Sequence, residues 1–194
     1  MNRIEHLLPE EIEKRSFEII SEELNRRGVI LPTEEEMITK RVIHTSADFD
    51  YTKTLTYSKD AVRIAKELIL NGADIVTDTN MALSGINKKT LARFGGEVHC
   101  FMAEEEVARL AKERGTTRAA ISMEMAAKLK KPVIFAIGNA PTALIQLYEM
   151  IDGRLETCIC DWCSCRFCEC RGSKGTDYGN GGSVYCESWK KRRK

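Results

Sequence analysis

A histidine with hydroxyl and carboxylate groups close behind it is the part of this sequence best suited to acid–base chemistry. His44 follows the β-branched pair Val42 and Ile43, and residues 45–48 supply two hydroxyls and a carboxylate. An imidazole gains and loses a proton near neutral pH, so His44 is a candidate general acid or base. The β-branched pair predicts a strand over residues 41–44 that ends at this histidine. A hydrogen-bonded structural histidine is the alternative interpretation.

The surrounding sequence predicts the elements that position this residue. Amphipathic spacing indicates a helix from Pro9 to about Arg26, and a second, short helix begins at about Thr33. Apolar runs at residues 73–77, 98–102 and 132–137 predict buried strands, and helical patterns separate them. Strands that alternate with helices favour a three-layer α/β/α fold with a mainly parallel sheet.

Ligands of such sheets bind beyond the carboxyl ends of the strands. This rule brings together residues 44–48, 78–81 and 138–142, with the helix start at 116–118 as a neighbour. Helix amino termini and Arg118 in this set suit a ligand that carries carboxylates. Arg118 as a solvated helix residue is the alternative.

Composition excludes several classes of partner. The chain has 194 residues and a net charge of +1, so no overall field favours nucleic acid or an anionic membrane. Only residues 190–194 form a dense basic run, and no apolar stretch approaches the length of a membrane span. We therefore expect a cytoplasmic protein with no nucleic-acid or membrane partner.

Four motifs together resemble the precorrin-8X methylmutase family, also called cobalt-precorrin-8 methylmutase or precorrin isomerase. They are R-V-I-H-T at residues 41–45, T-D-T-N-M at 77–81, G-T-T-R at 115–118 and G-N-A-P-T-A-L at 138–144. The last is the most specific. The resemblance covers about residues 4–157, so we expect a family domain over residues 1–157 and a separate tail over residues 158–194.

The resemblance implies an isomerase of cobalamin biosynthesis, an intramolecular methyltransferase. In this family a methyl group moves from C-11 to C-12 of the tetrapyrrole macrocycle and yields cobyrinate or hydrogenobyrinate. The resemblance implies no cofactor and no metal ligand from the protein, and it implies a homodimer. His44 is then the catalytic acid that protonates the macrocycle. The sequence does not distinguish a cobalt-containing substrate from a metal-free one.

The substrate carries acetate and propionate arms around a flat, partly apolar ring. The residues that the resemblance assigns to substrate binding are Arg15, Ser16, Thr45, Met81, Thr117, Arg118, Gly138, Asn139 and Thr142. The backbone N–H groups of residues 138–140 are expected to help. Asp48 and Asp78 are assigned to orienting His44 or to bonding backbone groups near the pocket.

The tail departs from the family. Residues 158–194 hold seven of the eight cysteines, and the family's last strand, P-V-G-F loop and glycine-rich end are missing. We expect this strand and the C-terminal segment to be absent or disordered, which would leave an exposed edge beside the strand at 132–137 or its neighbour.

We interpret this departure as the result of a frameshift. Residues 161–174 can be encoded so that the same nucleotides, read one base further on, spell I-G-V-P-V-G-F-V-N-V-V-E-A-K. Residues 176–194 likewise permit a shifted reading that ends in G-R-K-G-G-S. We therefore place a frameshift near residues 156–158; sequencing the gene there tests it, and an intact frame relative to related genes would contradict it.

Two alternatives of other classes remain open. The first is a catalytically impaired tetrapyrrole-binding protein. The second is an α/β domain with an appended Cys-rich metal-binding module, because Cys160 and Cys163, like Cys165 and Cys168, have metal-ligand spacing.

Overall fold

The computed structural model describes residues 9–152, 158–161 and 183–184, and the side chains of residues 11–150. The chain divides into two compact units, the first of which ends at Leu55 while the second begins at Thr56. Each unit has its own hydrophobic cluster or clusters. We describe each unit by itself.

The first unit is a helical hairpin followed by one helical turn. It consists of α1 (Pro9–Arg26), α2 (Thr33–Ser46) and α3 (Tyr51–Thr54). Ile20 and Leu24 of α1 pack with Ile43 of α2 in one buried cluster, and Val29, Leu31, Phe49 and Tyr51 surround it. The spacing of the two α1 residues, one helical turn apart, gives α1 a single apolar stripe toward α2.

The second unit is built on a parallel sheet. Its strands are β1 (Asp74–Thr77), β2 (Val98–His99), β3 (Val133–Ala136), β4 (Cys158–Asp161) and β5 (Ser183–Val184). They lie in the order β2-β1-β3-β4-β5, and every neighbouring pair is parallel. The helical segments are α4 (Ala61–Leu70), α5 (Asn80–Gly85), α6 (Lys88–Ala92), the 3₁₀ turn η1 (Phe101–Ala103), α7 (Glu105–Arg114), α8 (Arg118–Ala126) and α9 (Pro141–Asp152).

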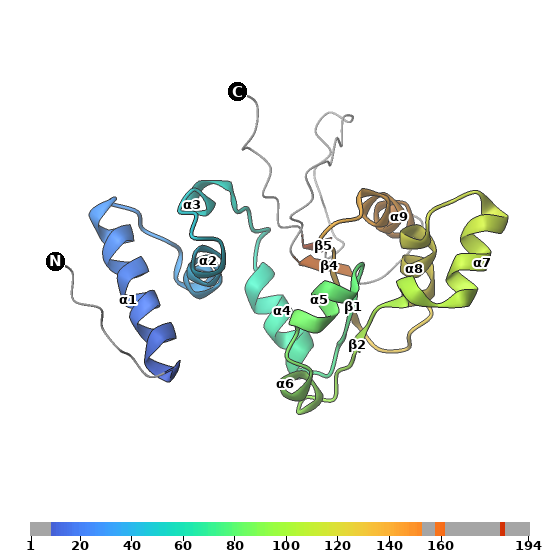
Figure 1. The fold of residues 1–194 in the computed structure, drawn as a ribbon, viewed down its shortest axis with the longest axis horizontal. Coiled ribbons are helices and arrows are strands. Elements are labelled where there is room, and N and C mark those ends of the chain that lie inside the picture. The colour runs from blue at the N-terminus through green and yellow to red at the C-terminus, as the bar shows by residue number, and fades with distance from the viewer. Residues whose placement is uncertain (1–8, 153–157, 162–182, 185–194) are drawn as a thin grey trace, which may run out of the picture. The chain divides into compact units, whose positions relative to one another are not determined.

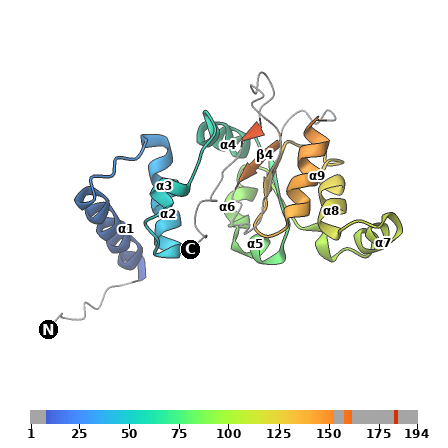
Figure 2. The same ribbon diagram turned by 90° about the horizontal axis from the view of Figure 1, so that it is seen from above.

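Helices cover both faces of this sheet. Val76, Phe135 and Ile137 pack on one face against Met123 of α8 and Leu147 of α9. The alternating residues Ile75 and Ile134 face the other way and pack with residues of α4. Figures 1 and 2 show α8 and α9 on one side of the strands and α4 on the other. Both faces can be covered because successive side chains of a strand point to opposite faces. The predicted α/β fold with a parallel sheet is therefore confirmed.

Strand β4 differs from our expectation for the tail. We expected the family's last strand to be missing or disordered, with an exposed edge beside the strand at 132–137 or its neighbour. Instead, β4 pairs with β3 in parallel register, with Val133 opposite Cys158 and Ala136 opposite Asp161. Strand pairing uses the main chain, which every sequence supplies, so a sequence unlike the family's can still extend the sheet.

Gly96 stands where the backbone leaves no room for a side chain. A Cβ atom added there would lie 2.3 Å from the carbonyl oxygen of Ala73, a main-chain atom next to β1. Because neither backbone can move without disturbing the sheet, we expect Gly96→Ala to lower the free energy of unfolding by about 3 kcal/mol. Urea unfolding followed by circular dichroism measures the change.

The matched control is Gly85→Ala in α5. Nothing lies within 4 Å of a Cβ added at Gly85, and alanine favours a helix over glycine by up to about 1 kcal/mol. This control should therefore leave stability unchanged or slightly raised. Equal midpoints for the two variants would contradict the proposed close contact at Gly96.

Candidate functional site

His44 lies in the last turn of α2, not at the end of a strand. The predicted strand at residues 41–44 is wrong because Thr39, Val42 and Ile43 are buried together, a spacing of three and four residues that belongs to one helix face. This packing outweighs the small helix penalty of two β-branched residues. The expectation that His44 ends a strand of the sheet is wrong for the same reason.

The ring of His44 is held by two adjacent residues of α1. The Ser16 hydroxyl oxygen lies 2.7 Å from Nδ1 of His44. The ring of Phe17 stacks on the imidazole, with ring centroids 5.5 Å apart and planes 22° from parallel. His44 is half-buried, and the described residues give its Nε2 atom no hydrogen-bond partner, nor is Nε2 among their buried unpaired atoms.

Two further residues extend this contact and were missed by the sequence analysis. The guanidinium carbon of Arg41 lies 4.9 Å from the centre of the Phe17 ring, and an Arg41 nitrogen lies 2.6 Å from a Glu13 carboxylate oxygen. Arg41 precedes His44 by three residues, so the two are neighbours only if residues 41–44 are helical. The sequence analysis missed these residues because it predicted a strand, not a helix, over residues 41–44.

An open groove of about 670 Å³ runs along the hairpin beside this group. Phe17 and Arg41 line it together with Lys14 and Glu18 of α1 and Met37 of α2. Its walls carry both signs of charge.

Other residues predicted for the site in this unit make local contacts. Arg15 forms an ion pair with Glu18 at 3.2 Å, and the Thr45 hydroxyl donates to the carbonyl of Arg41 at 3.0 Å. Asp48 accepts the backbone N–H of Asp50 at 2.9 Å. Asp48 thus bonds a backbone group, one of the two roles expected for it.

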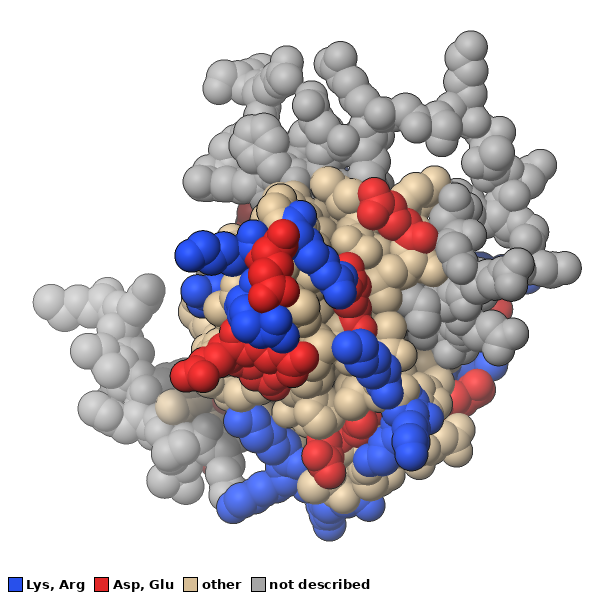
Figure 3. Space-filling model, turned by 90° about the vertical axis from the view of Figure 1, so that its right-hand side faces the viewer, with Lys and Arg blue, Asp and Glu red and all other residues tan. Residues whose placement is uncertain are grey.

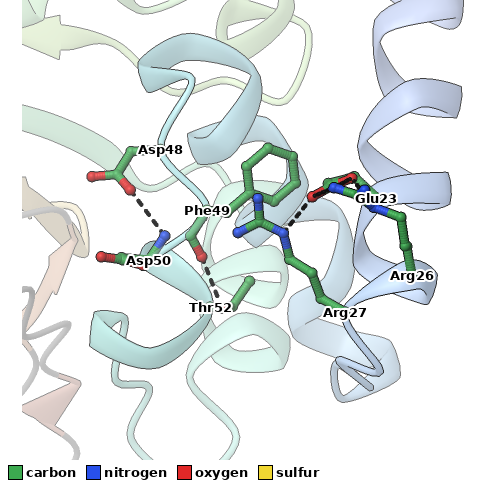
Figure 4. A network of polar contacts seen from close by, with 7 residues as sticks. All are labelled: Glu23, Arg26, Arg27, Asp48, Phe49, Asp50 and Thr52. Carbon is green, nitrogen blue, oxygen red and sulfur yellow. Dashed lines mark hydrogen bonds and ion pairs between the residues drawn. The ribbon is translucent and has the colours of Figure 1, made fainter.

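The end of α1 is tied to the loop after α2 by the network in Figure 4. Glu23 accepts from Arg26 at 2.8 Å and from Arg27 at 2.5 Å, and the Arg27 guanidinium lies 4.3 Å from the Phe49 ring centre. The hydrogen bond from Arg26, then that from Arg27, lowers the pKa of Glu23 from 4.5 to about 2. The network therefore needs Glu23 ionised.

This pKa sets a direction for the pH dependence of the hairpin. Because the carboxyl group has a lower pKa in the folded protein, its stabilising effect is complete above pH 4.5 and is lost as the pH falls toward about 2. We expect an NMR titration of the Glu23 carboxyl carbon to have its midpoint near 2 and to move upward in Arg26→Ala. Arg109→Ala, in the other unit, should leave it in place. A wild-type midpoint near 4.5 would contradict the network.

In the second unit, Asp78 holds the loop that follows β3. Asp78 lies directly after β1 and is 1% exposed. One carboxylate oxygen accepts the N–H of Gly138 at 3.0 Å, and the other accepts those of Asn139 at 2.8 Å and Ala140 at 2.7 Å. Asp78 therefore satisfies three backbone donors just before α9.

The same hydrogen bonds correct one expectation. The N–H groups of residues 138–140 were expected to bind substrate carboxylates, but Asp78 already occupies them. A second carboxylate would also be repelled by the first. The backbone groups of Gly138 and Asn139 therefore shape this loop. The exposed Asn139 side chain stays a candidate for substrate binding.

Two predicted threonines meet at the amino ends of α8 and α9. The Thr117 hydroxyl donates to the Thr142 hydroxyl at 2.9 Å, and Thr117 also caps α8 by accepting the N–H of Ala120. Arg118, the first residue of α8, is exposed and forms no ion pair with the described residues. Hydroxyls, a helix start and an uncommitted guanidinium suit a carboxylate ligand.

Met81 in α5 gives the same unit an exposed apolar group. Its side chain is 83% exposed and lies three residues after Asp78. A thioether is a flexible surface for a flat, apolar ligand.

The described residues indicate neither a metal centre nor a membrane span. They contain no group of three or more His, Cys, Asp or Glu side chains able to hold a metal ion. None of their helices is both long and apolar enough to cross a membrane. On the face drawn in Figure 3, acidic and basic side chains are interspersed.

The fold and these residues define a class: an α/β protein with an imidazole suited to proton transfer and helix starts suited to carboxylates. A sequence model of the precorrin-8X methylmutase family matches residues 11–159. The chain belongs to the precorrin-8X methylmutase family.

Named relatives agree with this assignment. The chain is 41% identical over 143 residues to a cobalt-precorrin-8 methylmutase of Priestia megaterium. The aligned region covers 74% of this chain and 63% of the relative. The chain is also 43% identical over 145 residues to the protein of that name from Salmonella typhimurium, covering 73% and 69%. A solved precorrin-8X methyl mutase from Thermus thermophilus superposes with a TM-score of 0.68 at 32% identity, covering 78% and 72%. The matched part therefore spans somewhat less than two thirds of the Priestia megaterium relative.

Proposed function

We propose that this protein is an isomerase of cobalamin biosynthesis that moves a methyl group from C-11 to C-12 of precorrin-8 or its cobalt form. Family membership over residues 11–159 supports the reaction class. The observation that supports the mechanism is His44, whose ring is held at Nδ1 by Ser16 while Nε2 has no partner among the described residues.

His44 supplies the acid in this proposal. A protonated imidazole donates to the macrocycle, which weakens the bond to the migrating methyl group. Because the product is an isomer of the substrate, one proton must leave for each proton gained. An imidazole can both give and recover a proton near neutral pH, which suits this cycle.

The second unit supplies carboxylate contacts. Thr117 and Thr142 place two hydroxyls together, and Arg118 adds a guanidinium without an ion-pair partner among the described residues. A guanidinium binds a carboxylate through two parallel hydrogen bonds, which suits an acetate or propionate arm. Asn139 adds an amide, and Met81 an apolar contact for the ring. Arg15 and Thr45 stay proposed contacts in the first unit.

Two further expectations belong to this proposal. The first is a homodimer, and the second is a cytoplasmic location. Sedimentation velocity at several protein concentrations tests the first.

Incubation of the full chain with cobalt-precorrin-8, and separately with metal-free precorrin-8, tests the activity. Conversion appears as the absorbance change from the substrate to the corrin chromophore, and equilibrium titration measures binding independently. Binding of both compounds without conversion would favour the tetrapyrrole-binding alternative. A chain whose reading frame is restored from about residue 156 is the matched comparison, because conversion by that chain alone would assign the defect to the tail.

A further inference from the structure

Among the described residues of the hairpin, the contact between Ser16 and His44 is the hydrogen bond that reaches an imidazole nitrogen, the titratable atom of the ring. Oγ of Ser16 lies 2.7 Å from Nδ1, a normal length for a strong hydrogen bond. Ser21, on the same helix, instead donates to the backbone carbonyl of Phe17 at 2.7 Å. Ser16 thus differs from an ordinary helical serine, which bonds its own helix.

A hydroxyl can serve Nδ1 in both charge states of the ring. When the neutral ring carries its proton on Nε2, the Ser16 O–H donates to the unprotonated Nδ1. When Nδ1 is protonated, in the charged ring or in the other neutral tautomer, Oγ accepts from Nδ1–H. Nδ1 is therefore engaged throughout, and Nε2 is the nitrogen left for another molecule. When Nε2 gives up its proton, the ring becomes neutral and Nδ1–H continues to donate its hydrogen bond to Oγ of Ser16.

The hairpin core makes this contact rigid. Ser16 and the stacking Phe17 are adjacent on α1, and Ile20 and Leu24 of the same helix pack on Ile43, the neighbour of His44. Ile20, Leu24 and Ile43 are each 5% exposed or less. A ring fixed by buried neighbours keeps its orientation during proton transfer.

We propose that Ser16 is a positioning residue that holds Nδ1 of His44, so that Nε2 is the atom that exchanges the proton with the substrate. This rests on the proposed role of His44 as the acid. It replaces the expectation that the Ser16 hydroxyl binds a substrate arm.

Ser16→Ala in the full chain tests the proposal, with Ser21→Ala as the matched control. In ¹H–¹⁵N spectra recorded with the imidazole ring protonated, the wild-type Nδ1–H of His44 should exchange slowly with water because Ser16 accepts it. In Ser16→Ala this resonance should broaden or vanish, and kcat should fall by about tenfold with little change in KM. Ser16→Thr keeps the hydroxyl, so it should recover most of the Nδ1–H resonance and most of kcat. Ser21→Ala should match the wild type in both measurements.

Two results would overturn the positioning role. One is a slowly exchanging Nδ1–H that survives in Ser16→Ala. The other is a raised KM with unchanged kcat, which would make Ser16 a substrate-binding residue after all. The spectrum needs no turnover, so it judges the Ser16 contact even if the chain proves inactive, whereas activity retained by His44→Ala would contradict the proposed function.

Discussion

Replacing His44 with alanine is expected to lower turnover of the tetrapyrrole by about a thousandfold or more, because a positioned general acid contributes roughly 10²- to 10⁴-fold to a rate. Binding of the product should change little, since none of the carboxylate contacts that we propose involves the His44 ring. Single-turnover absorbance measurements give the rate, and equilibrium titration gives the binding constant.

His44→Gln is the structural control for this variant. Glutamine keeps a polar side chain in the last turn of α2 but cannot donate a proton near neutral pH. It should therefore be as inactive as alanine while disturbing the contact with Phe17 less. Turnover near the wild-type rate in either variant would show that another group supplies the acid.

The second large effect is expected at Asp78, whose buried carboxylate accepts three backbone N–H groups. Asp78→Ala should lower the free energy of unfolding by about 4 kcal/mol or more, because it leaves three donors without their partner. Asp78→Asn has the same shape but turns one oxygen into a donor, so it should cost about 2 kcal/mol. Urea unfolding measures both.

Asp60→Asn is the matched control for Asp78→Asn. The Asp60 side chain is 42% exposed and lies 3.6 Å from Arg63, and asparagine tolerates the left-handed backbone that Asp60 adopts. An exposed pair contributes about 1 kcal/mol or less, so this control should stay near the wild type. If Asp78→Asn were as stable as Asp60→Asn, the loop at residues 138–140 would not depend on the carboxylate.

Strands β1, β2 and β3 of the parallel sheet could be predicted from the sequence because they lie in short, mostly apolar runs. The run at residues 132–137 contains β3 with one residue to spare at each end, and the run at 73–77 contains β1. Strands buried on both faces need no alternation, so the apolar run itself is the signal. The run at 98–102 was less accurate, because β2 ends at His99 and residues from Phe101 form a 3₁₀ turn.

Helix α2 could not be read from the same kind of signal. Val42 and Ile43 favour a strand locally, yet both are buried on a helix face with Thr39. The acidic residues in the first turn, Glu34–Glu36, indicated a helix start correctly, but the helix continues to Ser46, beyond the short helix that we predicted. Local propensity failed because the packing partners of this face lie in α1.

The candidate site could likewise be predicted only in part. The sequence motifs contain His44, Asp78 and the two threonines, which stay candidate site residues, and these motifs could be found because they are local. The contacts that give them their roles join residues 28 positions apart for Ser16 and His44, and 60 or more for Asp78 and its loop. No pattern within one segment encodes such pairs. The frameshift in the tail likewise stays a proposal that gene sequencing tests.

The clamp that Asp78 forms on the loop before α9 also bears on the entropy of ligand binding. Residues 138–140 lie beside the Thr142 hydroxyl, and their backbone is already ordered by a carboxylate on the neighbouring strand end. A free loop would lose about 1–2 kcal/mol of conformational entropy per residue when a ligand orders it. Here that loss occurs when the protein folds, so a substrate arm bound as we propose would keep more of its contact energy as affinity.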